Sequence, residues 1–327
     1  MRLPVRISVV CWAIGLVVLL GYTISRLLFF AHIFYGHAGT AWTQPQIQAI
    51  ANDSRPASIP KIIHNVFHNW KDPGNDALPS EYAKMRQTCI DLNPDFEFRL
   101  WTEKTSRELI EQEYPWFLRT YLGYRYPVQR VDAIKYFIML HYGGIYMDLD
   151  NGCRTNLSPL LRYDVWVTDG DRGALSNNIL GARPHHPFYH HLTLALLRYN
   201  WNWPLPFVRI MYASGQWFLT AVWEEYHALL PETQELGSNH HLYGLQRILM
   251  DGRPGAAEWT FFTHEGGGTW NNWDNQLFWA IGQHLGVFFT VLFVGAAVLG
   301  FVGMRCYRRV KARGYVPLAV RPNMSQV

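Results

Sequence analysis

Two long apolar runs lie near the ends of the chain, with mixed sequence between them. Residues 7–25 carry no charge, and after Arg26 the apolar run continues to Phe34. Residues 277–304 contain no Asp, Glu, Lys or Arg. About 20 apolar residues in a helix span the hydrocarbon core of a bilayer. A cleaved signal peptide would have a shorter apolar core followed by a small-residue cleavage site, which the first run does not show. We therefore predict two transmembrane helices, at residues 7–34 and 277–304.

Between these runs, short strand patterns alternate with helical ones. Helical spacing of apolar residues predicts helices at 79–91, 102–113 and 131–141. Short β-branched or alternating segments predict strands at 62–63, 96–101, 145–149 and 259–262. Asn93-Pro94 and Gly143-Gly144 are the expected breaks after two of the helices. Alternation of this kind predicts one α/β domain with a mainly parallel sheet covered by helices.

Basic residues flank the two apolar runs and set their orientation. Arg2 and Arg6 precede the first run, and one lysine and five arginines, with no acid, follow the second. Since basic flanks stay in the cytoplasm, residues 1–6 and the basic tail 305–327 are predicted to be cytosolic, with 35–276 on the far side. This central region holds 20 basic and 25 acidic residues, a net charge of −5. The chain's net charge of +4 therefore comes from membrane flanks and does not indicate a nucleic-acid partner.

The far side is expected to be the lumen of the secretory pathway. Asn52 and Asn156 each begin a glycosylation sequon in the central region. Cys89 and Cys153 are the only cysteines of that region. They could pair in an oxidising lumen, but the sequence leaves open whether their geometry permits a bond.

Asp148 and Asp150 are the strongest candidates for chemistry. They lie two residues apart at the end of the strand predicted at 145–149, so both side chains are expected on one face. In such sheets, ligands bind beyond the carboxyl ends of the strands. Two adjacent carboxylates repel each other unless a cation lies between them, and oxygen ligands suit Mg²⁺ or Mn²⁺. Acidic pairs are mostly solvated surface features, but the apolar residues around this pair indicate a site.

The region from 130 to 153 carries a specific resemblance to a known family. The stretches RVDAIKYF at 130–137 and HYGGIYMDLD at 141–150 resemble the DXD sugar-binding signature of glycosyltransferases. They are similar to the family that contains the yeast initiating α-1,6-mannosyltransferase and the fungal mannosyl-inositolphosphorylceramide synthases. The resemblance extends over about residues 58–270. It implies a GT-A-type nucleotide-diphospho-sugar transferase domain, here flanked by two transmembrane helices, that works with retention of anomeric configuration.

The resemblance assigns expected roles to individual residues. Asp148 is expected to contact the donor ribose and the metal, and Asp150 to bind the metal directly. Asp132 corresponds to an acid that hydrogen-bonds the donor sugar or ribose. Lys135 stands where many relatives have arginine, so it keeps a positive charge near the diphosphate without the bidentate fork. Tyr146 is expected either to contact the donor or to pack in the core with its hydroxyl paired.

The same resemblance implies a third metal ligand and an acceptor side. His264 lies before a glycine-rich loop at 265–270, where relatives place a histidine near the metal and diphosphate; Glu265 is a further candidate. Asn177, Asn178 and Ser214 are expected on the acceptor side. Arg130 is either a donor contact or an ion-pair partner of Asp132. The histidines at 185, 186, 190 and 191 have no accompanying cysteine, which disfavours a zinc site.

The acceptor is expected to be a lipid. Two anchors hold the edge of the domain close to the bilayer, and residues 201–218 are rich in aromatic side chains. Such a stretch is typical either of a membrane interface or of a buried core. The two-anchor plan resembles the mannosyl-inositolphosphorylceramide synthases, which implies transfer of mannose from GDP-mannose to inositol phosphorylceramide in a Golgi or other secretory-pathway membrane. The resemblance also implies a separate membrane regulatory subunit as a partner.

Two other functions remain open on sequence alone. One is transfer of a sugar to an N-glycan or to another glycolipid. The other is a non-catalytic regulatory membrane subunit, which the intact Asp148/Asp150 pair argues against because a scaffold has no need to hold two like charges together. The sequence shows no evident nucleophile for the retaining step.

Overall fold

The structure is a computed structural model that describes residues 14–25, 28, 36–49, 56–170, 173–230, 245–250, 258–264 and 272–313. The chain divides into two compact units, Met1–Trp270 and Asn271–Val327. The first contains the predicted α/β domain, and the second contains two helices near the C-terminus.

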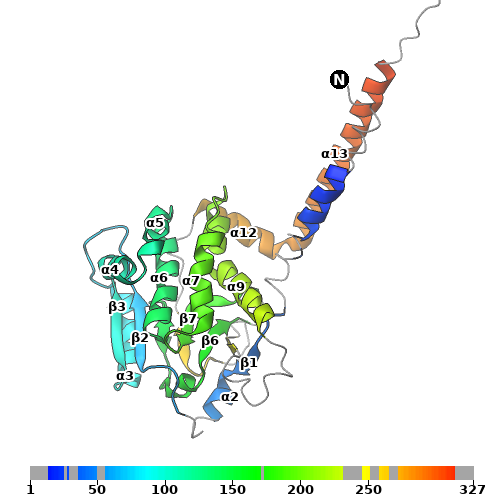
Figure 1. Cartoon of the computed structure of the whole chain (residues 1–327). Coiled ribbons are helices and arrows are strands. Elements are labelled where there is room, and N and C mark those ends of the chain that lie inside the picture. The colour runs from blue at the N-terminus through cyan, green and yellow to red at the C-terminus, as the bar shows by residue number, and fades with distance from the viewer. Residues whose placement is uncertain are drawn as a thin grey trace, which may run out of the picture. The chain divides into compact units, whose positions relative to one another are not determined.

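A seven-stranded sheet forms the centre of the first unit (Figure 1). Its strand order is β1-β8-β6-β7-β4-β2-β3. The bounds are β1 Thr40–Thr43, β2 Ile62–Val66, β3 Glu97–Trp101, β4 Gly144–Met147, β6 Val165–Asp169, β7 Ser176–Ala182 and β8 Gln246–Leu249. Every neighbouring pair is parallel except the two pairs that β7 forms, with β4 and with β6. The predicted mixed α/β architecture with a mainly parallel sheet is therefore confirmed.

Helices cover both faces of the sheet. They are α2 Gln44–Ala49, α3 Ser80–Leu92, α4 Glu103–Glu113, α5 Pro115–Gly123, α6 Pro127–His141, α7 Pro187–Tyr199, α8 Pro206–Ala213 and α9 Gln216–Leu229, with a 3-10 helix at Ser158–Arg162. Helices α6, α7 and α9 lie side by side on one face (Figure 1). Along β4, Tyr146 packs into the core under these helices, whereas Ile145 and Met147 pack into the core of the opposite face. Because successive side chains of a strand point to opposite faces, β4 contributes to the hydrophobic cores on both sides of the sheet.

Local patterns predicted several elements closely. The helices expected at 79–91 and 102–113 are α3 and α4, and the strand expected at 96–101 is β3. Thr102 begins α4 through a capping box, in which its side chain accepts from the Thr105 backbone N–H and the Thr105 side chain accepts in return. Helix α6 starts at Pro127, four residues before the expected start, because proline fits the first helical turn.

The strand predicted at 145–149 is shorter than expected. β4 ends at Met147, and the chain then turns, with the Asn151 backbone N–H donating to the Asp148 carbonyl at 3.1 Å. The argument that Asp148 and Asp150 share one face of a strand was therefore wrong. The turn, not the strand period, presents both carboxylates. The strand expected at 259–262 is displaced as well, since β9 covers Phe262–His264 and pairs antiparallel with β5, Asn151–Cys153.

Among the described residues, one helix is long and apolar enough to cross a membrane, Gly286–Arg309. It lies within α13, Leu285–Arg313. The run predicted at 277–304 is divided, because α12, Trp273–Gln283, ends at His284 before α13 begins. The N-terminal run shows a shorter apolar helix, Ile14–Ser25. The rest of the predicted anchor 7–34, apart from residue 28, lies outside the described residues, as do the segments 1–6 and 314–327 and the sequon at Asn52.

Cys89 and Cys153 form a disulfide, which answers the question that the sequence left open. The bond joins α3 to β5 across a sequence separation of 64 residues. We expect a Cys89→Ala/Cys153→Ala variant to lose about 4 kcal/mol of unfolding free energy, because a loop of this length is no longer closed in the unfolded chain. Denaturant titration of the full chain in detergent, with and without reductant, measures this. Exposed Cys306, changed to Ser, is the control. Equal stability of the oxidised wild type and the double variant would contradict the prediction.

Candidate active site

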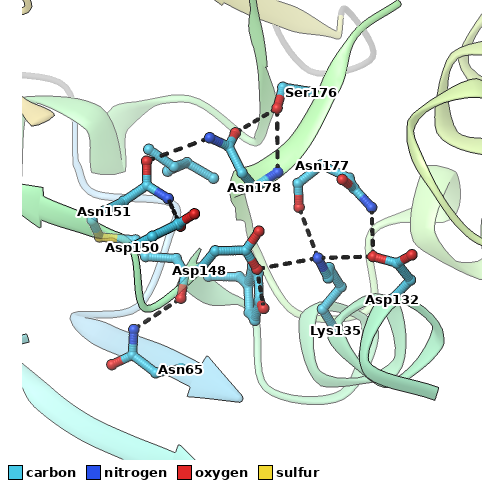
Figure 2. Close-up of polar contacts among 12 residues, drawn as sticks. Asn65, Asp132, Lys135, Asp148, Asp150, Asn151, Ser176, Asn177 and Asn178 are labelled. Carbon is cyan, nitrogen blue, oxygen red and sulfur yellow. Dashed lines mark hydrogen bonds and ion pairs between the residues drawn. The ribbon is translucent and has the colours of Figure 1, made fainter. Parts of the chain in front are cut away.

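The candidate site lies at the carboxyl end of β4, in the middle of the sheet. β4 runs parallel to β2 on one side and antiparallel to β7 on the other. The end of β4 therefore meets the beginning of β7, which carries Asn177 and Asn178. The Asp148 backbone N–H donates to the Asn178 carbonyl at 2.8 Å, which fixes the turn after β4 against β7. Figure 2 shows these residues converging on one region.

A cavity of about 750 Å³ opens at this end of the sheet. Polar residues on its wall come from the segment after β2, from α3, α6, β7 and α9, and from the turn after β4, and part of its apolar lining comes from α8. The charged and polar lining residues, aromatic ones aside, are His68, Asn69, Lys71, Glu81, Asp132, Lys135, Asp148, Asp150, Asn177, Asn178 and Gln216. Most of the residues that were predicted to form the site therefore face one cavity.

Two hydrogen-bond donors hold the Asp148 carboxylate in place. The hydroxyl of Tyr146 donates to Oδ1 of Asp148 at 2.6 Å, and the Lys135 ammonium donates to the same oxygen at 3.2 Å. Tyr146 is fully buried, and Lys135 lies 4.9 Å from the centre of its ring. Of the two roles expected for Tyr146, the structure favours core packing with a paired hydroxyl. Tyr146 orients Asp148 and is not among the cavity-lining residues.

Lys135 bridges two carboxylates. Its Nζ lies 3.1 Å from Oδ1 of Asp132 and 3.2 Å from Oδ1 of Asp148, and it also donates to the Asn177 carbonyl (Figure 2). Burial opposes the charge on Lys135, but the two carboxylates outweigh burial and raise the pKa of the ammonium. Burial raises the pKa of the Asp132 carboxyl, against the opposing effect of Lys135. A single buried cation thus offsets part of the negative charge of Asp132 and Asp148.

Asp132 is fixed by residues that were expected on the acceptor side. The Asn177 side-chain amide donates to Oδ1 of Asp132 at 2.9 Å, and the Ser214 hydroxyl lies 3.3 Å from Oδ2. Ser214 is fully buried, and Tyr136 donates to its carbonyl at 2.7 Å. Asn177 lines the cavity. Ser214 is not among the lining residues, and it contacts Asp132 from the protein interior. Arg130 pairs with Glu103 at 3.4 Å, so the described contacts do not join it to Asp132.

Asp150 is connected to Asn178, which was expected on the acceptor side, through Asn151, which sequence reasoning missed. The Asn151 side chain donates to Oδ1 of Asp150 at 2.7 Å, and Asn178 donates to Asn151 at 3.4 Å. Ser176 and Thr168 donate in turn to the Asn178 side chain. The signal in the sequence for Asn151 was its position directly after the acidic pair. The remaining contacts join β6, β7 and the turn, which no local pattern places together.

The donor set of this wall fits a divalent cation of the Mg²⁺ type. The carboxylates of Asp148 and Asp150 and neighbouring amide groups line the cavity, and hard cations take oxygen ligands. Within the described residues, no group of three or more His, Cys, Asp or Glu could hold a metal. The His264 backbone pairs with Asn151, next to Asp150. The His264 side chain, Glu265 and the loop 265–270 lie outside the described residues, so the third ligand stays a prediction.

The histidines at 185–191 do not gather into a metal site. His186 accepts from the Phe188 backbone N–H at the start of α7, and burial lowers its pKa to about 3. His191 lies 3.9 Å from Glu225, on the neighbouring helix.

Comparisons with known proteins agree with the site. Residues 79–167 match the family of glycosyltransferase sugar-binding regions containing the DXD motif. A mannosyl phosphorylinositol ceramide synthase of Saccharomyces cerevisiae, CSH1, is 38% identical over 233 residues, 71% of this chain and 58% of that protein. Inositol phosphoceramide mannosyltransferase 3 of Schizosaccharomyces pombe is 35% identical over 254 residues, 76% of this chain and 67% of that protein. The chain thus spans a little over half the length of the Saccharomyces relative.

Among solved structures, the match to the PaToxG glycosyltransferase covers 61% of this chain and 84% of the PaToxG chain, with a TM-score of 0.39 and 16% sequence identity. The two yeast relatives are more than 30% identical to this chain over alignments long enough to include the candidate site. The chain therefore belongs to the DXD-containing glycosyltransferase family that includes the mannosyl phosphorylinositol ceramide synthases and inositol phosphoceramide mannosyltransferases of these yeasts.

Proposed function

We propose that the protein is a metal-dependent, retaining glycosyltransferase that moves mannose from GDP-mannose to inositol phosphorylceramide. The observation that carries the proposal is the position of Asp148 and Asp150 on the wall of the cavity at the end of β4. The names of the relatives, which are mannosyltransferases of inositol phosphoceramide, support the sugar and the acceptor. The resemblance of the motif supports a GT-A-type domain and retention.

In the net reaction, the bond between the anomeric carbon and the donor diphosphate breaks. A new bond forms between that carbon and a hydroxyl oxygen of the acceptor, and GDP and a proton are released. Glycosyltransferases with the DXD motif generally use a divalent metal ion, and such an ion, held by Asp148 and Asp150, would neutralise the charge that develops on the diphosphate. Mn²⁺ or Mg²⁺ fits these oxygen ligands.

The chain's own residues prepare this cavity for the donor. Tyr146 and Lys135 hold Asp148 in one orientation through its Oδ1. Asn177 and Ser214 hold Asp132, which faces the cavity where we place the donor sugar or ribose. Because Lys135 is shared between two carboxylates, it acts on the donor through their positions more than through a direct contact. A preorganised arrangement of this kind lowers the cost of binding charge in the transition state.

We propose the membrane plan that the sequence suggested. Residues 7–34 and 277–304 contain the two spans, both termini are cytosolic, and residues 35–276 are lumenal in a Golgi or other secretory-pathway membrane. The Cys89–Cys153 disulfide supports an oxidising compartment for this domain. Asn156 is exposed, and its side chain donates to the Leu92 carbonyl. A membrane regulatory subunit remains part of the proposal.

The direct test offers the purified full chain two donors with one lipid. Radiolabelled GDP-mannose or UDP-glucose is added with Mn²⁺ and inositol phosphorylceramide in detergent. We expect labelled lipid from GDP-mannose alone. Product should disappear with a chelator and return with added Mn²⁺, because the acidic pair cannot by itself neutralise the leaving diphosphate.

The other outcomes separate the alternatives. Donor hydrolysis without lipid product, together with transfer to an oligosaccharide, would replace the lipid acceptor with a glycan. Product in the presence of chelator would contradict metal dependence. If neither donor is bound or consumed by folded protein, even with a co-purified membrane partner, the catalytic proposal is wrong and a regulatory subunit is the better description.

A further inference from the structure

A strip of exposed apolar side chains follows α7 and the segment after it. It consists of Leu194, Leu197, Trp201 and Trp203, which are 46%, 47%, 64% and 43% exposed. On the same helix, Leu192 and Leu196 are fully buried, so the strip is the outward face of an amphipathic helix and its continuation. The Trp201 ring is held in place by its N–H, which donates to the Arg198 carbonyl at 2.8 Å. We call these four residues the apolar strip.

The apolar strip is connected to the cavity through aromatic contacts. Trp203 stacks on Tyr212 of α8, with ring centres 5.9 Å apart, and Tyr212 packs against Trp217 at 5.2 Å. Phe207, also on α8, packs against Trp217 at 5.5 Å. Phe207 and Met211 line the cavity that Asp148 and Asp150 face. One short helix therefore separates the exposed strip from the candidate active site.

Exposed tryptophan and leucine side chains in one place require a partner. Single exposed apolar residues are ordinary, but four within ten residues form a patch of the kind that contacts another surface. Tryptophan is enriched where protein meets the polar boundary of a bilayer, because its ring is apolar and its N–H is polar. Two arginines lie beside the strip: Arg198 pairs with Glu225, and Arg209 donates to Asn202. Arginine side chains bind phosphate groups, which lipid headgroups carry.

Resting on the proposed function, we infer that the apolar strip lies in the bilayer interface, so that a lipid acceptor presents its headgroup across α8 to the cavity. A lipid whose chains stay in the membrane can react only if the mouth of the active site lies at the membrane surface. The chain carries a helix, Gly286–Arg309, that is apolar enough to cross a membrane, which would keep the domain beside a bilayer. The apolar strip then determines which face of the domain contacts the bilayer.

Lipid photolabelling of the full chain in vesicles tests where the bilayer touches the domain. The probe is a phospholipid with a diazirine near its headgroup, in vesicles that also contain inositol phosphorylceramide, and labelled peptides are mapped by mass spectrometry. Leu229 is the matched control, because it is 68% exposed and ends α9. Ring contacts pair the end of α7 with the start of α9, through Tyr199 and Phe218, and the start of α7 with the end of α9, through Phe188 and Tyr226. Leu229 is thus an exposed leucine at the opposite end of the same helix pair.

We expect peptides that contain residues 194–203 to be labelled at least about tenfold more than the peptide that contains Leu229. Equal labelling of the two, or labelling of Leu229 alone, would overturn the inference. Protection of the strip by a bound protein, seen as a protein–protein crosslink in place of lipid label, would overturn it in favour of a protein partner.

An activity measurement separates a membrane role from a structural one. We compare Leu197→Ser/Trp201→Ser with Leu229→Ser, since none of these three residues lines the cavity. The strip variant should lose roughly tenfold in kcat/KM for inositol phosphorylceramide in vesicles and keep donor hydrolysis unchanged. An equal loss of donor hydrolysis would mean a structural role and overturn the inference. If no acceptor is used by any form of the protein, the proposed function fails, while the labelling pattern still decides the place of the strip.

Discussion

Replacing Asp150 with Asn is expected to reduce mannose transfer at least about a thousandfold while the protein stays folded. The change removes one negative charge and keeps the size of the side chain. Asp150 lies in the turn after β4, partly exposed on the cavity wall, and Asn151 donates to it. Stabilisation of charge on a leaving group by a positioned ion contributes several kcal/mol, which corresponds to this loss of rate.

The measurement is kcat/KM with labelled GDP-mannose and inositol phosphorylceramide, alongside direct titration of Mn²⁺. Asp95→Asn is the matched control, because Asp95 pairs with Lys61 on the surface, about half exposed and away from the cavity lining. We expect the control to keep both activity and Mn²⁺ binding. Activity of Asp150→Asn within tenfold of wild type, or unchanged Mn²⁺ affinity, would mean that this carboxylate does not hold the metal.

Elements set by local sequence were predictable, and the contacts within the site largely were not. Thr102 predicted the start of α4, because the capping residues lie within one turn of each other. By contrast, Ser214 meets Asp132 across 82 residues and Asn177 meets it across 45. Only the path of β7 beside β4 and the packing of α8 against α6 bring them together. No periodic pattern in one segment encodes such a meeting.

The acidic pair was placed correctly at a strand end, although the strand geometry used in the argument was incorrect. The expected strand geometry placed both carboxylates on one face, but β4 stops at Met147. The next backbone N–H, that of Asp148, still donates to Asn178, and the chain turns immediately afterwards. The residue types and their place at a strand end were therefore informative, whereas the exact spacing was not. The family resemblance implied a positive charge of Lys135 near the donor diphosphate, and sequence alone did not show that Lys135 also lies between Asp132 and Asp148.

The second large effect concerns stability: replacing Lys135 with Met is expected to lower the unfolding free energy by about 3–5 kcal/mol at pH 7. Lys135 is only 2% exposed and is the cation between Asp132 and Asp148. Its removal leaves two carboxylates without their shared counter-ion, and breaking a buried ion pair from one side has a cost of this size. Since the pKa of Lys135 is raised in the folded protein, its contribution is fully present at pH 7 and is lost only as the pH rises through that raised pKa.

A second substitution distinguishes charge from packing. Asp132→Asn, added to Lys135→Met, removes one of the two stranded carboxylates, so the double variant should recover part of the lost stability. The pH dependence should agree: burial already raises the pKa of Asp132, and loss of the ammonium raises it further, so Lys135→Met should regain stability as the pH falls and that carboxyl takes up a proton. The measurement is a double-mutant cycle. Wild type, Lys135→Met, Asp132→Asn and the double variant are unfolded by denaturant titration in detergent at pH 7 and pH 5. If the two substitutions destabilise additively, Lys135 contributes through packing alone, and the acids of this cavity wall do not depend on a buried cation.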